Sequence, residues 1–287
     1  MPRLFIFGLG FSGRGIARRL AAEGWEVAGT TRSGEAADLP GLRHFTFDRD
    51  HPLPPGALAG TTHLLSTVPP GPAGDPVLEA LGGQLRGLGL AWAGYLSTTG
   101  VYGDRGGGWV DEESELRPTG ERSRRRVAAE AAWLAAGLPA HVFRLAGIYG
   151  PGRSAIDTVR AGTAQRIAKP GQVFGRIHVE DIAQVVRASM ARPRPGAIYN
   201  LADDDPAPPG DVVLHACRLL GAEPPPELSW DEACRQLSPM ALSFFADNKR
   251  VSNRRIKSEL GVTLRYPTYR EGLAAILEED GQVSGAL

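Results

Sequence analysis

The sequence predicts an α/β protein in which helices cover both faces of a doubly wound parallel sheet. Three observations carry this prediction: short apolar runs that alternate with helical segments, a glycine-rich turn directly after the first run, and a change of texture after Pro151. Fully apolar strands are typical of parallel sheets buried on both faces, with right-handed crossovers between them. The chain has 287 residues, 42% of them hydrophobic, which is enough for one large domain and a smaller lobe.

Six apolar runs are expected to form strands of this sheet, and turns or helical segments separate them. The runs cover residues 3–7, 25–31, 43–47, 62–68, 91–99 and 140–150. An amphipathic stretch from Ser12 to Glu23, ended by Gly24, is predicted to be the first helix. Residues 176–201 look like another helix and strand, which return the chain to the sheet.

The turn after the first run carries glycines at the GxGxxG spacing, Gly8, Gly10 and Gly13. Small residues at this spacing permit a tight turn, a close approach of the backbone to a pyrophosphate, and close helix packing. The spacing alone is weak evidence in a chain with 37 glycines. Its position is more specific, because the turn opens a helix whose N-terminal amides favour anions. We therefore expect a Rossmann-type fold that binds a dinucleotide through these glycines, Phe11 and Ser12, with a purely structural turn as the alternative.

The end of the second strand indicates which dinucleotide is bound. Folds that prefer NAD carry an acidic residue there for the ribose 2′-hydroxyl, whereas this chain has Thr31, Arg32 and Ser33. Arginine offers a fork of donors suited to a phosphate, and the two hydroxyls add to it. NADP is therefore favoured over NAD, although Arg32 could instead be one more exposed arginine. Topology places four further residues along the expected path of the adenine and ribose: Asp48, Thr67, Val68 and Pro69.

The change of texture after Pro151 gives the expected domain organisation. Residues 1–150 form the dinucleotide-binding domain, which 176–202 and part of 247–287 complete. The irregular, Pro-rich segments 151–175 and 203–246 are expected to form a smaller C-terminal substrate lobe.

Several ordered motifs resemble the extended short-chain dehydrogenase/reductase family, which includes nucleotide-sugar epimerases and dehydratases. After the glycine turn, these motifs are residues 97–103 (STTGVYG), 144–152 (RLAGIYGPG), 176–183 (RIHVEDIA) and 199–201 (YNL). Residues 248–253 and 259–261 resemble the tail of an epimerase-like branch called atypical. The resemblance covers most of the chain and implies an NAD(P)-dependent oxidoreductase or an epimerase/dehydratase-like enzyme.

In that family, a hydroxyl residue three positions before the valine of the VYG motif hydrogen-bonds the substrate oxygen. Here that residue is Thr98, at the carboxyl edge of a central strand, where ligands bind in open α/β sheets. The alternative is a hydroxyl that only caps the end of the strand.

The resemblance breaks at the Tyr-x-x-x-Lys pair of the family. Alignment on Glu130 puts Arg122 in the place of the tyrosine and Arg126 in the place of the lysine. A guanidinium stays protonated, so it cannot act as a general acid or base near pH 7. The arginines of this helix either form a solvated face or hold an anionic group of the substrate.

Other residues are candidates for the missing proton donor. Tyr149 follows the sixth strand, close to the expected nicotinamide pocket, although such tyrosines more often pack or make a structural hydrogen bond. His178 and Asp181 raise the same question, and for both a structural role is favoured. Two functions therefore stay open: an enzyme in which Thr98 polarises the substrate and another group or water moves the proton, or a non-catalytic NADP-binding sensor.

Composition narrows the partners and the location. Lys+Arg and Asp+Glu both total 32, so neither nucleic acid nor an anionic membrane is expected as a partner. The N-terminal apolar run is too short for a signal peptide or a membrane span, and the two cysteines fit neither a metal site nor a disulfide framework, so a cytoplasmic protein is expected. The expected partners are a small-molecule substrate, with an anionic group if the arginines contact it, and a second copy of the chain, because family members often form homodimers.

Overall fold

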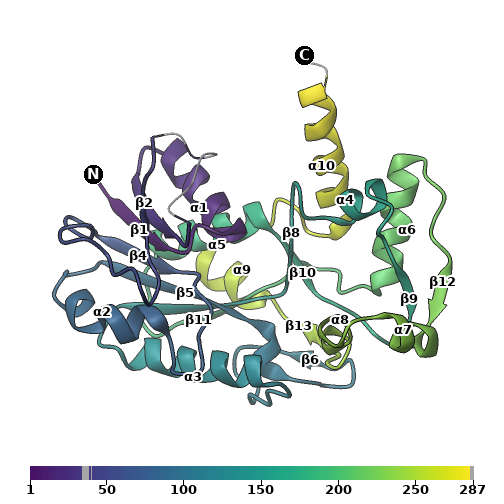
Figure 1. Cartoon of the computed structure of the whole chain (residues 1–287), viewed down its shortest axis with the longest axis horizontal. Coiled ribbons are helices and arrows are strands. Elements are labelled where there is room, and N and C mark those ends of the chain that lie inside the picture. Colours follow the sequence, from purple (N-terminus) through teal and green to yellow (C-terminus); the bar gives the residue numbers. More distant parts are fainter. Residues whose placement is uncertain (34–38, 40, 285–287) are drawn as a thin grey trace.

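The structure, a computed structural model, describes residues 1–33, 39 and 41–284. Within these ranges, the centre of the molecule is a seven-stranded sheet in the order β11-β7-β5-β4-β1-β2-β3, and all neighbouring strands in it are parallel (Figure 1). The strands are β1 (Arg3–Phe7), β2 (Glu26–Thr31), β3 (Arg43–Thr46), β4 (His63–Ser66), β5 (Trp92–Thr98), β7 (Ala140–Leu145) and β11 (Ile198–Leu201). The chain builds outward from β1 in one direction and then from β4 in the other, so the predicted doubly wound sheet is confirmed.

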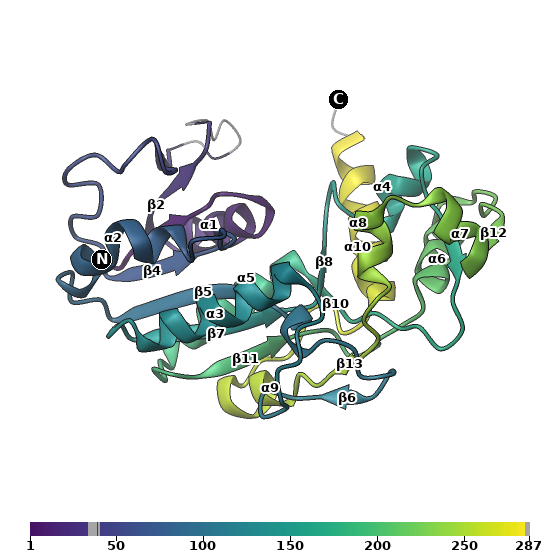
Figure 2. The same ribbon diagram turned by 60° about the horizontal axis from the view of Figure 1, so that its bottom comes forward.

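Helices cover both faces of the sheet (Figures 1 and 2). One face packs against α1 (Phe11–Ala22), α5 (Val179–Ala191) and α9 (Arg254–Leu260), and the other against α2 (Pro76–Arg86) and α3 (Glu121–Ala135). The side chains of β1 alternate between the two layers: Leu4 and Ile6 lie in the first core, whereas Phe5 and Phe7 lie in the second. This alternation explains why the strand reads as a continuous apolar run.

A smaller lobe stands beside the carboxyl edge of the sheet. It contains β8 (Gly147–Tyr149) paired with β10 (Arg176–His178), and β9 (Arg166–Ala168) paired with β12 (Glu227–Ser229). Its helices are α4 (Ala155–Arg160), α6 (Pro209–Leu220), α7 (Trp230–Gln236), α8 (Pro239–Phe244) and α10 (Tyr269–Ser284). A separate apolar cluster joins β8, α4, α6 and α10. Of the C-terminal segment, α9 therefore packs on the sheet and α10 packs in the smaller lobe.

The run at 140–150, expected as one strand, is divided into β7 and β8. The division falls at Ala146, whose backbone N–H donates to the Leu201 carbonyl at 2.9 Å. Beyond this point the chain leaves the seven-stranded sheet, and β8 pairs with β10 instead. Between β5 and α3 the chain forms a short 3-10 turn, η1 (Thr99–Tyr102), and β6 (Trp109–Val110), which pairs with β13 (Arg250–Val251).

Candidate cofactor and active site

The turn between β1 and α1 has the backbone geometry of a phosphate-binding loop. Gly8 has a φ of +92°, which side chains rarely permit. A Cβ at Gly13 would lie 2.3 Å from the Gly8 carbonyl oxygen, so the helix and the turn pack too closely for a side chain. A Cβ at Gly10, by contrast, would meet no atom within 4 Å. The first glycine therefore forms the turn, the third permits packing, and the second leaves open space.

The N-terminus of α1 lies at this turn. Gly10 is its N-cap residue, no side chain caps the helix, and its first turn carries no acidic residue. The first amides of a helix lack intrahelical partners, and together with the helix dipole they favour a bound anion. Phe11 is half-buried and Ser12 is buried at the start of the helix. The residues present thus fit the pyrophosphate of a dinucleotide.

The end of β2 is held against the turn by Thr30. Its hydroxyl accepts a hydrogen bond from the Gly8 N–H at 3.0 Å, and its carbonyl accepts one from the Leu9 N–H at 2.7 Å. Beyond it, the hydroxyl oxygen of Thr31 is enclosed and has no hydrogen-bond partner among the described residues. Arg32 and Ser33 are exposed. The three residues expected to distinguish NADP from NAD, at positions 31–33, therefore lie at the carboxyl edge of the sheet, one strand away from the turn.

Two further segments expected along the cofactor path also reach this edge. The Thr67 hydroxyl donates to the Gly8 carbonyl at 2.7 Å, and Val68 lies beside the same glycine, so residues 67 and 68 form a wall of the turn. Asp48 follows β3 on the other side, and its Oδ1 lies 2.8 Å from the Nδ1 of His51. This hydrogen bond, with two backbone amides of the same loop, lowers the pKa of Asp48.

Thr98 ends β5 at the same edge of the sheet. Its Oγ1 accepts a hydrogen bond from the Gly100 N–H at 3.1 Å and so caps η1. A hydroxyl carries both acceptor lone pairs and one hydrogen. The capping bond uses a lone pair, which leaves the hydrogen of Thr98 for a substrate oxygen.

A chain of buried hydrogen bonds fixes the strand ends behind this residue. Ser97 donates to the Glu130 carboxylate at 2.5 Å, and Glu130 pairs with Arg144 at 2.8 Å. Arg144 donates to the Tyr102 hydroxyl at 2.9 Å, which donates to Asn200 Oδ1 at 2.7 Å. Burial raises the pKa of Tyr102 to about 12. The network joins β5, α3, β7, η1 and β11, so it positions the carboxyl edge of the sheet.

Tyr149 lies in the smaller lobe with its hydroxyl directed at α10. The hydroxyl donates to the Thr268 carbonyl at 3.4 Å, and a Cβ at Gly272 would lie 2.1 Å from the same oxygen. Burial raises the pKa of Tyr149, whereas a proton shuttle at neutral pH needs a lowered one. These contacts favour the packing role.

His178 and Asp181 both hold backbone amides. The Nδ1 of His178 caps α5 by accepting the Glu180 N–H at 3.3 Å, and burial lowers its pKa to about 4. The Asp181 carboxylate accepts the N–H groups of Arg265 and Tyr266 at 2.7 and 3.1 Å. These bonds suit the structural role that the sequence favours.

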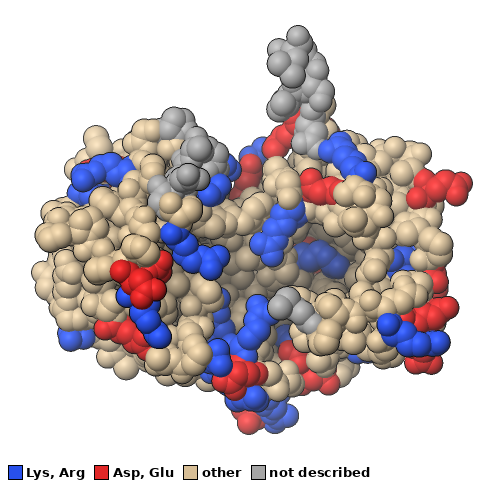
Figure 3. Space-filling view, in the orientation of Figure 1, with Lys and Arg blue, Asp and Glu red and all other residues tan. Residues whose placement is uncertain are grey.

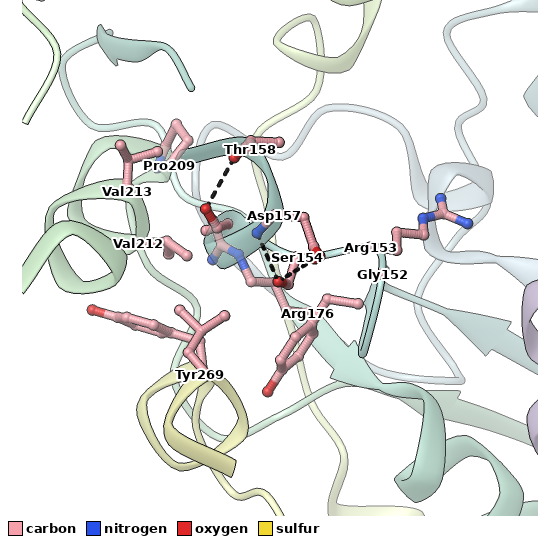
Figure 4. Close-up of a pocket in the computed structure, with 13 residues that line it drawn as sticks. Gly152, Arg153, Ser154, Asp157, Thr158, Arg176, Pro209, Val212, Val213 and Tyr269 are labelled. Atoms are coloured by element: carbon pink, nitrogen blue, oxygen red, sulfur yellow. Dashed lines mark hydrogen bonds between the residues drawn. The ribbon is translucent and has the colours of Figure 1, made fainter. Parts of the chain in front are cut away.

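A cavity of about 500 Å³ lies between β8, α4, α6 and α10 (Figure 4). Its wall combines aromatic and aliphatic side chains with the Arg176 guanidinium, which lies 5.8 Å from the centre of the Tyr269 ring. Figure 3 shows the face of the molecule hollowed between the sheet and this lobe, with Lys and Arg side chains around the hollow. The lining residues are Tyr149, Gly152, Arg153, Ser154, Ala155, Asp157, Thr158, Arg176, Pro209, Val212, Val213, Tyr269 and Leu273.

Comparison with known proteins gives three informative relatives, although no family model matches the chain. Protein YeeZ of Escherichia coli K12 is 30% identical, over 93% of this chain and 97% of YeeZ. A functionally unknown conserved protein of Silicibacter pomeroyi DSS is 51% identical with a TM-score of 0.89, over 98% and 99% of the two chains. A "putative NAD-dependent epimerase/dehydratase" of Methylobacillus flagellatus is 25% identical with a TM-score of 0.74, again over 98% and 99%. The chain belongs to the epimerase/dehydratase-like short-chain dehydrogenase/reductases.

The fold extends to more distant members. The human epimerase family protein SDR39U1 (isoform 2), whose structure contains NADPH, is 19% identical with a TM-score of 0.73, over 96% of this chain and 99% of that one. Within the described ranges of this chain, no helix is both long and apolar enough to span a bilayer.

In this short-chain dehydrogenase/reductase, α3 carries neither a tyrosine nor a lysine. Arg122 is exposed on its first turn. Arg126 donates to the Tyr95 hydroxyl at 2.8 Å and to the Leu96 carbonyl at 2.9 Å. Arg126 therefore ties α3 to β5, and Arg122 lies on the solvated face.

Ser123 of α3 lies beside the same glycine as Thr98, and the sequence pattern did not single it out. A Cβ at Gly100 would lie 3.0 Å from Ser123 Oγ and 3.4 Å from Thr98 Oγ1, so the two hydroxyls border the same small space. Alignment on Glu130 selects Arg122, one position earlier. Because each residue turns a helix by about 100°, these neighbours point in different directions. A hydroxyl residue in the first turn of the helix was the available signal.

Proposed function

We propose that the protein is an NADP(H)-dependent oxidoreductase of the epimerase/dehydratase-like type. The observation that carries this proposal is the turn at residues 8–13, in which Gly10 leaves open space before an uncapped helix N-terminus. The exposed Arg32 at the end of β2 supports the 2′-phosphorylated form of the cofactor. The human fold relative contains NADPH, which supports a nicotinamide cofactor in this site.

Thr98 and Ser123 are the groups we assign to the substrate oxygen. When bound, a nicotinamide would supply a hydride to a carbon of the substrate or take one from it. The two hydroxyls, which border one space beside Gly100, donate hydrogen bonds to the oxygen on that carbon and so stabilise its developing negative charge. Neither hydroxyl titrates near pH 7, so water supplies the proton, and we expect turnover about 100-fold or more below that of an enzyme with a general acid.

The part of the substrate away from this oxygen is proposed to occupy the cavity beside β8, whose lining includes neither Thr98 nor Ser123. Its aliphatic wall, which includes Val212 and Leu273, suits an apolar part of the ligand, and Arg176 suits an anionic group. A small anionic carbonyl compound or sugar derivative fits this combination.

One observation favours a second function, that of a non-catalytic NADP-binding sensor. Thr98 caps η1 and Arg126 binds the β5 backbone, so two of the expected catalytic residues have structural partners. A sensor needs the cofactor turn but no turnover.

The experiment that separates these functions supplies the purified protein with NADPH and a panel of carbonyl compounds and nucleotide sugars. We expect oxidation of NADPH, abolished in Thr98→Ala and reduced in Ser123→Ala, with Thr99→Ala as the neighbouring control. Tight NADPH binding without turnover on any compound would support the sensor. Absence of binding to both NADPH and NADH would reject both functions.

A further inference from the structure

The smaller lobe places an arginine beside the phosphate-binding turn. Arg153 lies in a tight hairpin in which the N–H groups of Gly150 and Arg153 each donate to the carbonyl of the other, at 3.1 and 3.0 Å. Gly152 at the tip has a φ of +72°, which closes the hairpin. The backbone of Arg153 is thus fixed.

This hairpin is packed directly on the start of α1. A Cβ at Gly150 would lie 3.2 Å from the Cζ of Phe11 and 2.7 Å from a methyl group of Val179. A Cβ at Gly15 of α1 would lie 2.7 Å from the other Val179 methyl group. Val179 is therefore wedged between the hairpin and α1, and these close contacts set the position of the hairpin relative to the turn.

The side chain of Arg153 also points towards the start of α1. Figure 4 shows its guanidinium extending away from the cavity that its backbone lines. The Cζ of Arg153 lies 5.4 Å from the centre of the Phe11 ring. Phe11 directly follows Gly10 in the sequence. The side chain is exposed, and it makes no hydrogen bond or ion pair within the described part of the chain. A guanidinium stacked on a ring keeps its N–H groups free at its edge.

A dinucleotide brings two negative charges to the turn, and residues 8–13 contain no cation to meet them. Arg14, the next basic residue, donates from its Nε to the Leu9 carbonyl at 2.8 Å. We propose that Arg153 binds the pyrophosphate of the dinucleotide, as a phosphate ligand contributed by the smaller lobe. This inference rests on the proposed cofactor site and adds a residue that neither the glycine motif nor the end of β2 contains.

The pyrophosphate is common to NADPH and NADH, whereas the 2′-phosphate belongs to NADPH alone. Loss of Arg153 therefore weakens both cofactors by the same factor. Loss of Arg32 weakens NADPH selectively. This difference separates the two arginines in a single pair of titrations.

The test measures the dissociation constants of NADPH and NADH for the wild-type protein, Arg153→Gln and Arg153→Lys. Arg218→Gln is the matched control, because Arg218 is an exposed arginine of the same lobe outside the cavity. We expect Arg153→Gln to weaken both cofactors about tenfold, which is typical for one charge-assisted hydrogen bond. Arg153→Lys keeps the charge but not the planar fork of donors, so we expect it to lose less affinity than Arg153→Gln. Arg218→Gln should leave both dissociation constants unchanged. The thermal unfolding temperature of each cofactor-free variant is measured in parallel.

Unchanged affinity in Arg153→Gln would overturn the inference and leave the proposed function intact. The same holds if the affinity is unchanged while the unfolding temperature falls, because the stack on Phe11 then only fastens the lobes together. Weakening of NADPH alone would move Arg153 to the 2′-phosphate and reject the pyrophosphate role. If Arg153→Gln does not fold, Arg153→Lys decides: a weakening of both cofactors by one factor supports the inference, and wild-type affinity for both overturns it. A wild-type protein that binds neither cofactor would reject the proposed function and this inference with it.

Discussion

Gly10 and Gly13 differ in what a side chain would meet at each position. Gly13→Ala would place a methyl group 2.3 Å from the Gly8 carbonyl oxygen, so we expect it to destabilise the fold by about 1–3 kcal/mol. The methyl group of Gly10→Ala would extend into empty space, so the free energy of unfolding without cofactor should stay within about 0.5 kcal/mol of wild type. The affinity for NADPH should fall, because the methyl group occupies the space assigned to the cofactor. Urea unfolding and NADPH titration of both variants check this pair. Full affinity in Gly10→Ala would contradict the assignment of the open space to the cofactor.

Arg32 tests the choice between the two nicotinamide cofactors. Arg32→Ala removes an exposed guanidinium at the end of β2. We expect the dissociation constant of NADPH to rise by about tenfold to a hundredfold, and that of NADH to change little, because only NADPH carries the 2′-phosphate. Calorimetric titration measures both constants. An equal loss for the two cofactors would show that Arg32 does not select between them.

Arg122 and Arg126 occupy one helix but have different surroundings. Arg126→Ala leaves the buried Tyr95 hydroxyl without its donor, so we expect a loss of about 1–3 kcal/mol in the free energy of unfolding. Arg122→Ala, on the exposed first turn, should cost less than about 0.5 kcal/mol. Urea unfolding of both variants makes the comparison. A larger effect at Arg122 would mean that the helix face is misassigned.

Among the elements, the start of α5 should carry a measurable pH dependence. Burial lowers the pKa of His178 to about 4, below its ordinary value near 6.5. The unfolded chain therefore takes up a proton between pH 6.5 and pH 4 that the folded chain resists, so stability is lost as the pH falls through this window. The loss from this group is on the order of 2–3 kcal/mol.

His178→Asn tests this assignment, because asparagine also caps helices well. The variant loses the contacts of the ring with Tyr149 and Tyr266, so it should be less stable than wild type at pH 7. As the pH falls from 7 to 4, the gap between the two proteins should narrow. Parallel unfolding curves at several pH values measure this gap, and a constant gap would contradict the lowered pKa.

The division of the run at 140–150 shows why the end of a strand is hard to predict from the sequence. Residues 140–145 and 147–149 are equally compatible with one long strand, because both are rich in aliphatic and aromatic side chains. What separates them is the edge of the sheet, where β11 ends at Leu201 and no longer offers a partner. Only the neighbouring strand determines where β7 stops.

For the whole molecule, the cofactor should act as a stabilising ligand. NADPH at about 100 times its dissociation constant adds roughly 2.7 kcal/mol to the free energy of unfolding if only the folded protein binds it. For a chain of this size we expect a rise of about 5 °C in the thermal unfolding temperature. Differential scanning calorimetry with NADPH measures the shift, and Gly10→Ala is the matched variant that should show a smaller one. An unchanged temperature in wild type would count against a preformed cofactor site.

The sequence by itself determined the parallel sheet, the position of the glycine turn and the family. Each depends on local patterns: apolar runs of strand length, glycines at a fixed spacing before a helix, and short motifs in a fixed order. The turn at residues 8–13 could be located in advance because the turn and the helix that it opens are contiguous in the chain.

Only the tertiary structure decided which side chains meet. Ser123 borders the same space as Thr98 because packing and Arg126 set the rotation of α3 against β5, whereas an alignment one residue out of phase selects Arg122. Arg153 reaches Phe11 across the two lobes, from a hairpin more than a hundred residues away in the chain. Contacts of this kind depend on the relative placement of distant elements, which long-range packing sets and local patterns do not encode.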